Sequence, residues 1–152
     1  MRTPVRHVGV RLFLSLAAGA TAMLGLVGCA SDEPTTRETA AGAELGRLDP
    51  EQFAARMGNP DAAVINVHVP YEGELESTDA FIHFERIVGD AQLPEDKDSE
   101  VLLYCMTGRM SDIAGKALIG QAGYTDVAHL EGGMKAWEAA GRRLIHDQNH
   151  AQ

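Results

Sequence analysis

Cys105 is the residue best suited to covalent chemistry. It directly follows the apolar run Val101–Tyr104, which predicts a buried strand, and a helical pattern begins within about one turn of it. A helix amino terminus presents unpaired backbone N–H groups and the positive end of the helix dipole. Because this field favours a thiolate over a thiol, the position predicts a nucleophilic sulfur. The alternative is a buried structural cysteine, the commonest fate of a free thiol.

The residues after Cys105 are suited to an anion-binding turn. Gly108 permits a tight turn, and Arg109 adds a fixed positive charge. We expect the backbone amides of this loop to point at whatever occupies the sulfur position, so that the loop can stabilise a thiolate or a persulfide. The candidate substrate-binding residues are Met106, Thr107, Gly108, Arg109, Met110 and Ser111.

Three other arrangements are weaker. In Cys-dependent phosphatases an arginine follows the cysteine after five intervening residues and clamps the phosphoryl oxygens; that position here is Ser111. His68 ends a predicted strand and is either a candidate auxiliary acid or base or simply a polar strand end. His146 and His150 have the i, i+4 spacing of metal ligands on a helix but lack a third ligand, so we expect no metal site.

Alternating strands and helices must position the Cys105 loop. Asp49 and Pro50 predict the start of a helix, and Gly123 and Gly141 are expected to end the later two. The predicted strands are 62–67, 101–104 and 127–130, and the predicted helices are 50–57, 111–121 and 134–140. This alternation predicts an α/β fold with a central parallel sheet, helices on both faces and ligands at the carboxyl ends of the strands.

One internal segment and the total charge complete the description of the folded part. Residues 71–89 have no regular periodicity and predict a long, acidic loop with a short strand or helical turn near 84–88. Thirteen Lys and Arg against 22 Asp and Glu give a net charge of −9, which argues against nucleic-acid binding. Two cysteines exclude a disulfide framework and a four-thiolate zinc site. With 152 residues, one folded domain is expected.

The amino-terminal residues resemble an export signal. Three arginines precede an apolar stretch at 12–27, which is shorter than the roughly 20 residues of a membrane-spanning helix. The run Leu26-Val27-Gly28-Cys29 resembles the bacterial lipobox, whose cysteine receives diacylglycerol. We therefore expect a lipoprotein signal peptide at 1–28, lipidation of Cys29, and attachment to the cell envelope outside the cytoplasm. A permanent single-pass anchor is the alternative. The composition of 29–44 is typical of a flexible tether.

The chain resembles the single-domain rhodanese family of sulfurtransferases over residues 45–145, followed by a polar tail at 146–152. The resemblance rests on CMTGRMS after an apolar strand, on LEGGMKAW, and on the Ala140-Gly141 pair. It implies that Cys105 takes sulfane sulfur from thiosulfate or a persulfide donor, carries it as a persulfide and passes it to a thiophilic acceptor. In the resemblance the amides of residues 106–111 form the cradle, and Arg109 matches an arginine common at the fifth loop position. No cofactor is implied.

Two positions depart from the family pattern. Met106 stands where many relatives have arginine, and Asn66-Val67-His68 replaces the usual Asp-x-Arg after the first core strand. The alternative function is therefore a non-catalytic module of the same fold, which binds a partner or senses sulfur or oxidants through Cys105. The partners expected are a small sulfur donor or a protein persulfide, and a membrane through the lipid on Cys29. We expect the domain to be monomeric.

Overall fold

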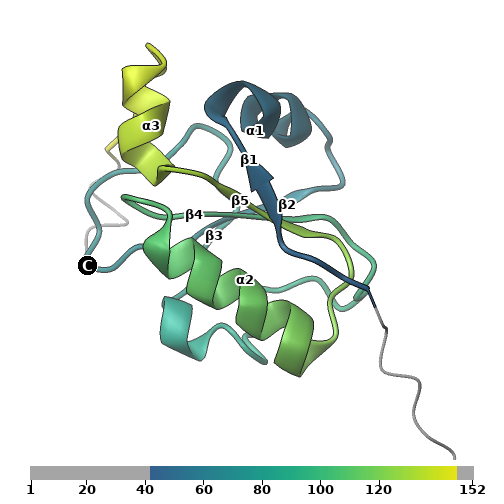
Figure 1. Cartoon of the computed structure of the whole chain (residues 1–152). Helices are drawn as coiled ribbons and strands as arrows, with labels where there is room; N and C mark the ends of the chain where they lie inside the picture. Colours follow the sequence, from purple (N-terminus) through teal and green to yellow (C-terminus); the bar gives the residue numbers. More distant parts are fainter. Residues whose placement is uncertain (1–41, 147–152) are drawn as a thin grey trace, which may run out of the picture. The chain divides into compact units, whose positions relative to one another are not determined.

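The computed structural model describes residues 42–146, so the predicted export signal, Cys29, residues 29–41 of the predicted tether and His150 lie outside the described residues. Five parallel strands form one sheet in the order β1-β5-β4-β2-β3 (Figure 1). The strands are β1 (Gly46–Leu48), β2 (Ala63–Asn66), β3 (Ala80–Phe81), β4 (Val101–Tyr104) and β5 (Val127–Leu130). The helices are α1 (Pro50–Met57), α2 (Arg109–Ala122), α3 (Gly133–Ala139) and the short 3₁₀ helix η1 (Phe84–Arg86). Within 42–146, no helix has the length and apolar character needed to cross a membrane.

Helices cover both faces of the sheet, as expected for this α/β class. Figure 1 shows α1 and α3 on one face and α2 on the other, with η1 beside α2. Alternate residues of β4 point to opposite faces: Leu103 belongs to the core under α2, whereas Leu102 and Tyr104 belong to the core under α1 and α3. Because both faces are buried, the strands are continuous apolar runs rather than alternating ones.

The register of the sheet brings the ends of its central strands together. β4 lies between β2 and β5, and Tyr104 is paired with Asn66 in β2. Beyond the strands, the Val67 amide donates to the Tyr104 carbonyl at 2.9 Å. Cys105 therefore lies at the carboxyl edge of the sheet, which is where ligands bind in open α/β sheets.

Local signals at the helix ends explain most of the helix bounds. Asp49 accepts hydrogen bonds from two first-turn amides of α1, and Gln52 completes a capping box. α2 begins at Arg109, two residues earlier than predicted, because Gly108 adopts φ 88° and turns the chain directly into the helix. Gly123, at φ 77°, ends it. The last helix is shifted by one residue from its predicted start, to Gly133.

Two edge strands were not predicted. β1 and β3 have three and two residues, which is too short for an alternating pattern to be visible in the sequence. Close packing against β5 requires a glycine in β1. A side chain at Gly46 would place its Cβ 2.9 Å from the Cβ of Ala128 in β5. The segment around 84–88 does contain the expected helical turn, η1.

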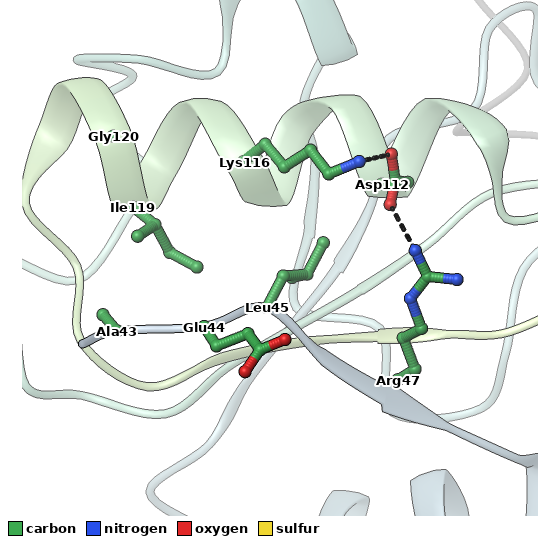
Figure 2. A pocket seen from close by; sticks show the side chains of 8 residues that line it. All are labelled: Ala43, Glu44, Leu45, Arg47, Asp112, Lys116, Ile119 and Gly120. Carbon is green, nitrogen blue, oxygen red and sulfur yellow. Dashed lines mark hydrogen bonds and ion pairs between the residues drawn. The ribbon is translucent and has the colours of Figure 1, made fainter.

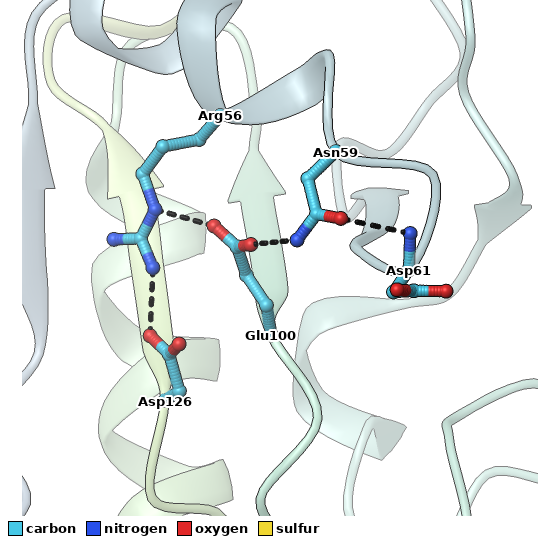
Figure 3. A network of polar contacts seen from close by, with 5 residues as sticks. All are labelled: Arg56, Asn59, Asp61, Glu100 and Asp126. Atoms are coloured by element: carbon cyan, nitrogen blue, oxygen red, sulfur yellow. Dashed lines mark hydrogen bonds and ion pairs between the residues drawn. The ribbon is translucent and has the colours of Figure 1, made fainter.

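A polar network lies at the amino edge of the sheet (Figure 3). Cys105 follows β4 and therefore lies at the opposite, carboxyl edge. Glu100 precedes β4 and Asp126 precedes β5, and both accept hydrogen bonds from the guanidinium of Arg56 at the end of α1. The second carboxylate oxygen of Glu100 accepts from Asn59 Nδ2 at 2.8 Å. The Glu100 side chain is only 13% exposed, so these donors replace most of the water that would otherwise hydrogen-bond to its carboxylate.

We predict that Glu100→Gln lowers the free energy of unfolding by about 1 to 2 kcal/mol, because the amide replaces a charged acceptor by a group that cannot accept both hydrogen bonds. Urea denaturation measures the change. Asp61→Asn is the matched control, since Asp61 contributes its backbone amide to Asn59 and keeps that bond. Equal stability of the two variants would contradict a structural role for the network.

Candidate active site

The Cys105 loop folds tightly around its own sulfur. The backbone N–H of Gly108 donates to Cys105 Sγ at 3.1 Å, and Ser111 Oγ lies 3.6 Å from the same sulfur. The cysteine is 1% exposed. The positive φ of Gly108 is required here, and a Cβ at this position would lie 3.1 Å from the amide nitrogen of Gly132. The predicted strand-loop-helix arrangement is present, with α2 beginning four residues after the cysteine.

The amino end of α3 binds the other side of the loop. The Met134 amide donates to the Cys105 carbonyl at 2.8 Å, and the Lys135 amide donates to the Met106 carbonyl at 3.1 Å. This close approach needs glycine, because a Cβ at Gly133 would lie 2.2 Å from the Cys105 carbonyl oxygen. The LEGGMKAW motif therefore contacts the Cys105 loop directly. Its two glycines allow α3 to approach the loop, and the amides of Met134 and Lys135 donate to the carbonyls of Cys105 and Met106.

The remaining loop side chains divide between solvent and core. Thr107 and Arg109 are exposed, and among the ion pairs of residues 42–146 none involves Arg109. Its guanidinium can therefore meet an anionic substrate. Met106 packs against the core under α1 and α3, and Met110 packs against the core under α2. The two methionines anchor the loop between the layers of the domain.

His129 is a site residue that the sequence reasoning missed. It lies in β5, is 4% exposed, and its Nδ1 lies 3.2 Å from Ser111 Oγ. A row of buried groups therefore runs from Cys105 through Ser111 to His129. The sequence does contain a signal for this residue. A histidine inside the apolar run Val127–Leu130 of a predicted parallel sheet is expected to be buried and to need a polar partner.

The hydrogen bonds assign the tautomer of His129. Ser111 has one proton, which it donates to the Gly108 carbonyl at 3.0 Å, so the bond to His129 needs a proton on Nδ1. Nε2 is buried without a partner within the described part of the chain. It is therefore the unprotonated nitrogen of a neutral ring. Burial lowers the pKa of His129 below 6.5, and the carboxylate of Asp112 opposes that shift only in part.

His68 lies at the same edge of the sheet but has a different partner. Its backbone amide donates to Asn66 Oδ1 at 2.9 Å, and its Nε2 lies 2.5 Å from a carboxylate oxygen of Glu72. No hydrogen bond between His68 and Cys105 is found among residues 42–146. The structure therefore places a His–Glu pair near the end of β2, where the family pattern has an arginine.

The acidic loop is anchored by Tyr104. The hydroxyl of this buried tyrosine accepts from the Leu75 amide at 3.1 Å and lies 2.5 Å from Thr78 Oγ1, and burial raises its pKa. Glu74 is buried, whereas the Glu72 side chain is 53% exposed. Of the acids in this loop, Glu72 is the one that pairs with the histidine following β2.

A pocket of about 300 Å³ lies elsewhere, between α2 and the segment that leads into β1 (Figure 2). Asp112 pairs there with Lys116 and Arg47. None of its lining residues belongs to the loop 105–111, so the Cys105 loop does not form this pocket. Within the described residues, no group of three or more His, Cys, Asp or Glu side chains is placed to bind a metal ion.

The family of this chain is shown by a match to a family sequence model. The sequence model of the Rhodanese-like domain matches residues 49–140, which contain the Cys105 loop, α2, β5 and all of α3. The chain belongs to the rhodanese-like domain family. The layered parallel sheet described above is the fold that this membership implies.

Curated and solved relatives agree with the rhodanese-like assignment. The chain is 29% identical over 97 residues to "Thiosulfate sulfurtransferase GlpE" of Pseudomonas putida, covering 63% of this chain and 87% of that protein. It is 34% identical over 98 residues to the uncharacterized protein slr1261 of Synechocystis, covering 62% and 53%, so it spans about half of that relative. The solution structure of the rhodanese-like domain of Alr3790 from Anabaena superposes with a TM-score of 0.59 at 22% identity, covering 70% of this chain and 83% of that one.

We predict that Gly133→Ala lowers the free energy of unfolding by more than about 2 kcal/mol, because the new Cβ collides with the Cys105 carbonyl and the residue has φ 61°. Gly120→Ala is the control, since nothing lies within 4 Å of its Cβ and alanine favours a helix by up to about 1 kcal/mol. Urea denaturation compares them. A Gly133→Ala protein as stable as Gly120→Ala would refute the close docking of α3.

We also predict that stability decreases as the pH falls below 6.5, the ordinary pKa of histidine. The unfolded chain binds a proton at His129 there, whereas the folded chain does not until the pH reaches the lowered native value, so protonation favours unfolding. Stability from this group is complete above 6.5. The measurement is the difference in free energy of unfolding between wild type and His129→Asn across this range. A difference that does not change with pH would contradict the prediction.

Proposed function

We propose that this rhodanese-like domain is a sulfurtransferase in which Cys105 carries sulfane sulfur as a persulfide. The observation that carries the proposal is the 3.1 Å hydrogen bond from the Gly108 amide to Cys105 Sγ, made inside a loop that opens α2. A preformed N–H donor at the sulfur stabilises a thiolate without reorganisation during the reaction. Arg109, which is exposed and forms no ion pair with the described residues, supplies positive charge for an anionic donor.

The proposed reaction has two balanced steps. The Cys105 thiolate attacks the sulfane sulfur of thiosulfate; a new S–S bond forms, the S–S bond of the donor breaks, and sulfite leaves with the electron pair. An acceptor nucleophile such as cyanide then attacks the terminal sulfur of the persulfide, giving thiocyanate and regenerating the thiolate. With a persulfide donor, a thiolate leaves in place of sulfite. Neither step needs a redox cofactor or a metal.

The donor that the site favours carries less negative charge than thiosulfate. Arg109 is the one cationic side chain of residues 105–111, because Met106 occupies the position next to the cysteine. Glu72 adds an exposed carboxylate near the end of β2. Since a dianion gains less from this balance of charges than a monoanionic or protein-bound persulfide does, we propose a persulfide as the preferred donor.

We further propose that the domain works at the cell envelope, outside the cytoplasm, as a lipoprotein. The support is the Leu26-Val27-Gly28-Cys29 run at the end of an apolar stretch. Diacylglycerol on Cys29 would attach the chain to the membrane, and residues 30–44 would connect it to the folded domain. The acidic chain itself offers no attraction to anionic lipid, so the acyl chains would provide the attachment.

We predict that Cys105→Ser abolishes sulfur transfer, because serine cannot form a persulfide. The full chain, extracted in detergent, is assayed for thiocyanate formation with thiosulfate and with cysteine persulfide as donors. Cys29→Ser is the matched control: it removes the other cysteine of the sequence and should retain transfer while moving the protein from the membrane to the soluble fraction.

The outcomes separate the proposals. Transfer that survives in Cys105→Ser would refute the persulfide mechanism, and membrane retention of Cys29→Ser would refute the lipid anchor. A folded wild-type protein without transfer from either donor would instead favour the non-catalytic binding or sensing module. Better use of thiosulfate than of cysteine persulfide would contradict the proposed donor preference.

A further inference from the structure

Three buried side chains from three different segments, one of them the cysteine itself, form a row at the candidate reactive sulfur. Cys105 follows β4, Ser111 lies in the first turn of α2, and His129 lies in β5. Their relative exposures are 1%, 0% and 4%. Ser111 Oγ is 3.6 Å from Cys105 Sγ and 3.2 Å from His129 Nδ1. The row is shielded from bulk solvent, so protein groups, either side chains of the row or the backbone, are the expected partners of its protons.

The number of protons limits what Ser111 can do. Its hydroxyl can donate to one group and accept from others. In the structure it donates to the Gly108 carbonyl, which also accepts from the Asp112 amide in the first turn of α2. The Gly108 carbonyl therefore keeps a donor when the serine proton turns away. The sulfur lies within reach of that same hydroxyl.

A histidine proton on Nδ1 decides how the serine proton is used. If His129 were to accept from Ser111, the hydroxyl proton would be fixed on the ring and could not reach the sulfur. With Nδ1 as the donor, the ring occupies a lone pair of Ser111 Oγ and leaves the proton free to turn between the Gly108 carbonyl and Cys105. Nε2, which has no partner in residues 42–146, fits this tautomer, because a buried N–H without an acceptor would be more costly than a bare nitrogen.

We propose that His129 is a positioning residue: by donating Nδ1–H to Ser111 Oγ, it directs the Ser111 hydroxyl proton to the sulfur whenever Cys105 is anionic. The thiolate then accepts from Gly108 N–H and from Ser111 O–H, and the persulfide formed on Cys105 is held by the same two donors. The inference rests on the proposed sulfurtransferase function for its effect on catalysis, but the hydrogen-bond arrangement itself does not.

Several charged groups surround His129 and bear on the pH of any test. Asp112 and Lys116 face it from α2, Arg47 from β1, where it is paired in register with His129, and Glu131 from the end of β5. The negative and positive charges partly compensate one another. Because burial is the largest influence on the ring and disfavours its charged form, His129 remains the neutral donor at pH 7.

The test compares His129→Leu with His129→Asn in the full chain. Leucine removes the donor with little change in volume, whereas the amide of asparagine returns an N–H near the position of Nδ1. The first readout is the rate of Cys105 alkylation by iodoacetamide against pH, followed by mass on the peptide containing Cys105 so that Cys29 does not contribute. The second is kcat for sulfur transfer.

For His129→Leu we expect the midpoint of the alkylation profile to move to higher pH and kcat to fall about threefold to tenfold, the effect of one hydrogen bond. His129→Asn should stay within about twofold of wild type on the same scale. In a Ser111→Ala background His129→Leu should have little additional effect, because the serine hydroxyl through which His129 acts on the sulfur is absent. Circular dichroism confirms folding, and if the leucine variant does not fold, His129→Gln replaces it, since its longer side chain moves the amide away from Nδ1.

Three results would overturn the inference: a leucine variant that matches wild type, leucine and asparagine variants that are equally impaired, or a leucine effect that persists undiminished with Ser111→Ala. A wild-type protein without sulfur transfer would refute the proposed function instead. The alkylation profiles would still decide the role of His129 in that case.

Discussion

The docking of the Cys105 loop on the amino end of α3 is the constraint on which the candidate site depends. Two carbonyls of the loop, those of Cys105 and Met106, accept hydrogen bonds from the first amides of that helix. A side chain at Gly133 would prevent this contact, and one at Gly108 would crowd Gly132. Since α3 follows β5 closely in the chain, the contact connects the carboxyl ends of two neighbouring strands. It also keeps the two carbonyls engaged with α3, while the Gly108 amide reaches the sulfur.

The two edges of the sheet have different physical roles. At the amino edge, Arg56, Glu100 and Asp126 form a network of ion pairs and hydrogen bonds between α1, β4 and β5 (Figure 3). At the carboxyl edge, glycines with positive φ and a buried thiol form a tight loop whose conformation is maintained by its neighbours. Stability supplied at one edge allows a constrained conformation at the other, which is a common arrangement for sites placed at strand ends.

The carboxyl edge of the sheet carries fewer unpaired positive charges than the rhodanese-like family pattern would place there. Met106 turns its apolar side chain toward the core under α1 and α3. His68 is paired with Glu72 rather than presenting an unpaired cation. Arg109 therefore provides the positive charge of the loop by itself, while backbone N–H and buried hydroxyl groups supply the remaining polar character. Under the proposed function, such a site would select its donor more by hydrogen bonding to sulfur than by attraction to a highly charged anion.

The sequence by itself determined the features that depend on neighbouring residues. The Asp49-Pro50 cap, the apolar runs of β4 and β5, the glycine at the end of α2 and the strand-to-helix position of Cys105 were all readable, and with them the α/β class and the family resemblance. Tertiary structure decided the rest. β1 and β3 are strands because longer strands pair with them, and His68 is joined to Glu72 by the path of a loop without periodicity. His129 meets Ser111 across 18 positions of sequence, because β5 lies beside β4 and under the first turn of α2. Local patterns reflect the preferences of adjacent residues, whereas the partner of a buried polar group depends on which distant segments the sheet places side by side.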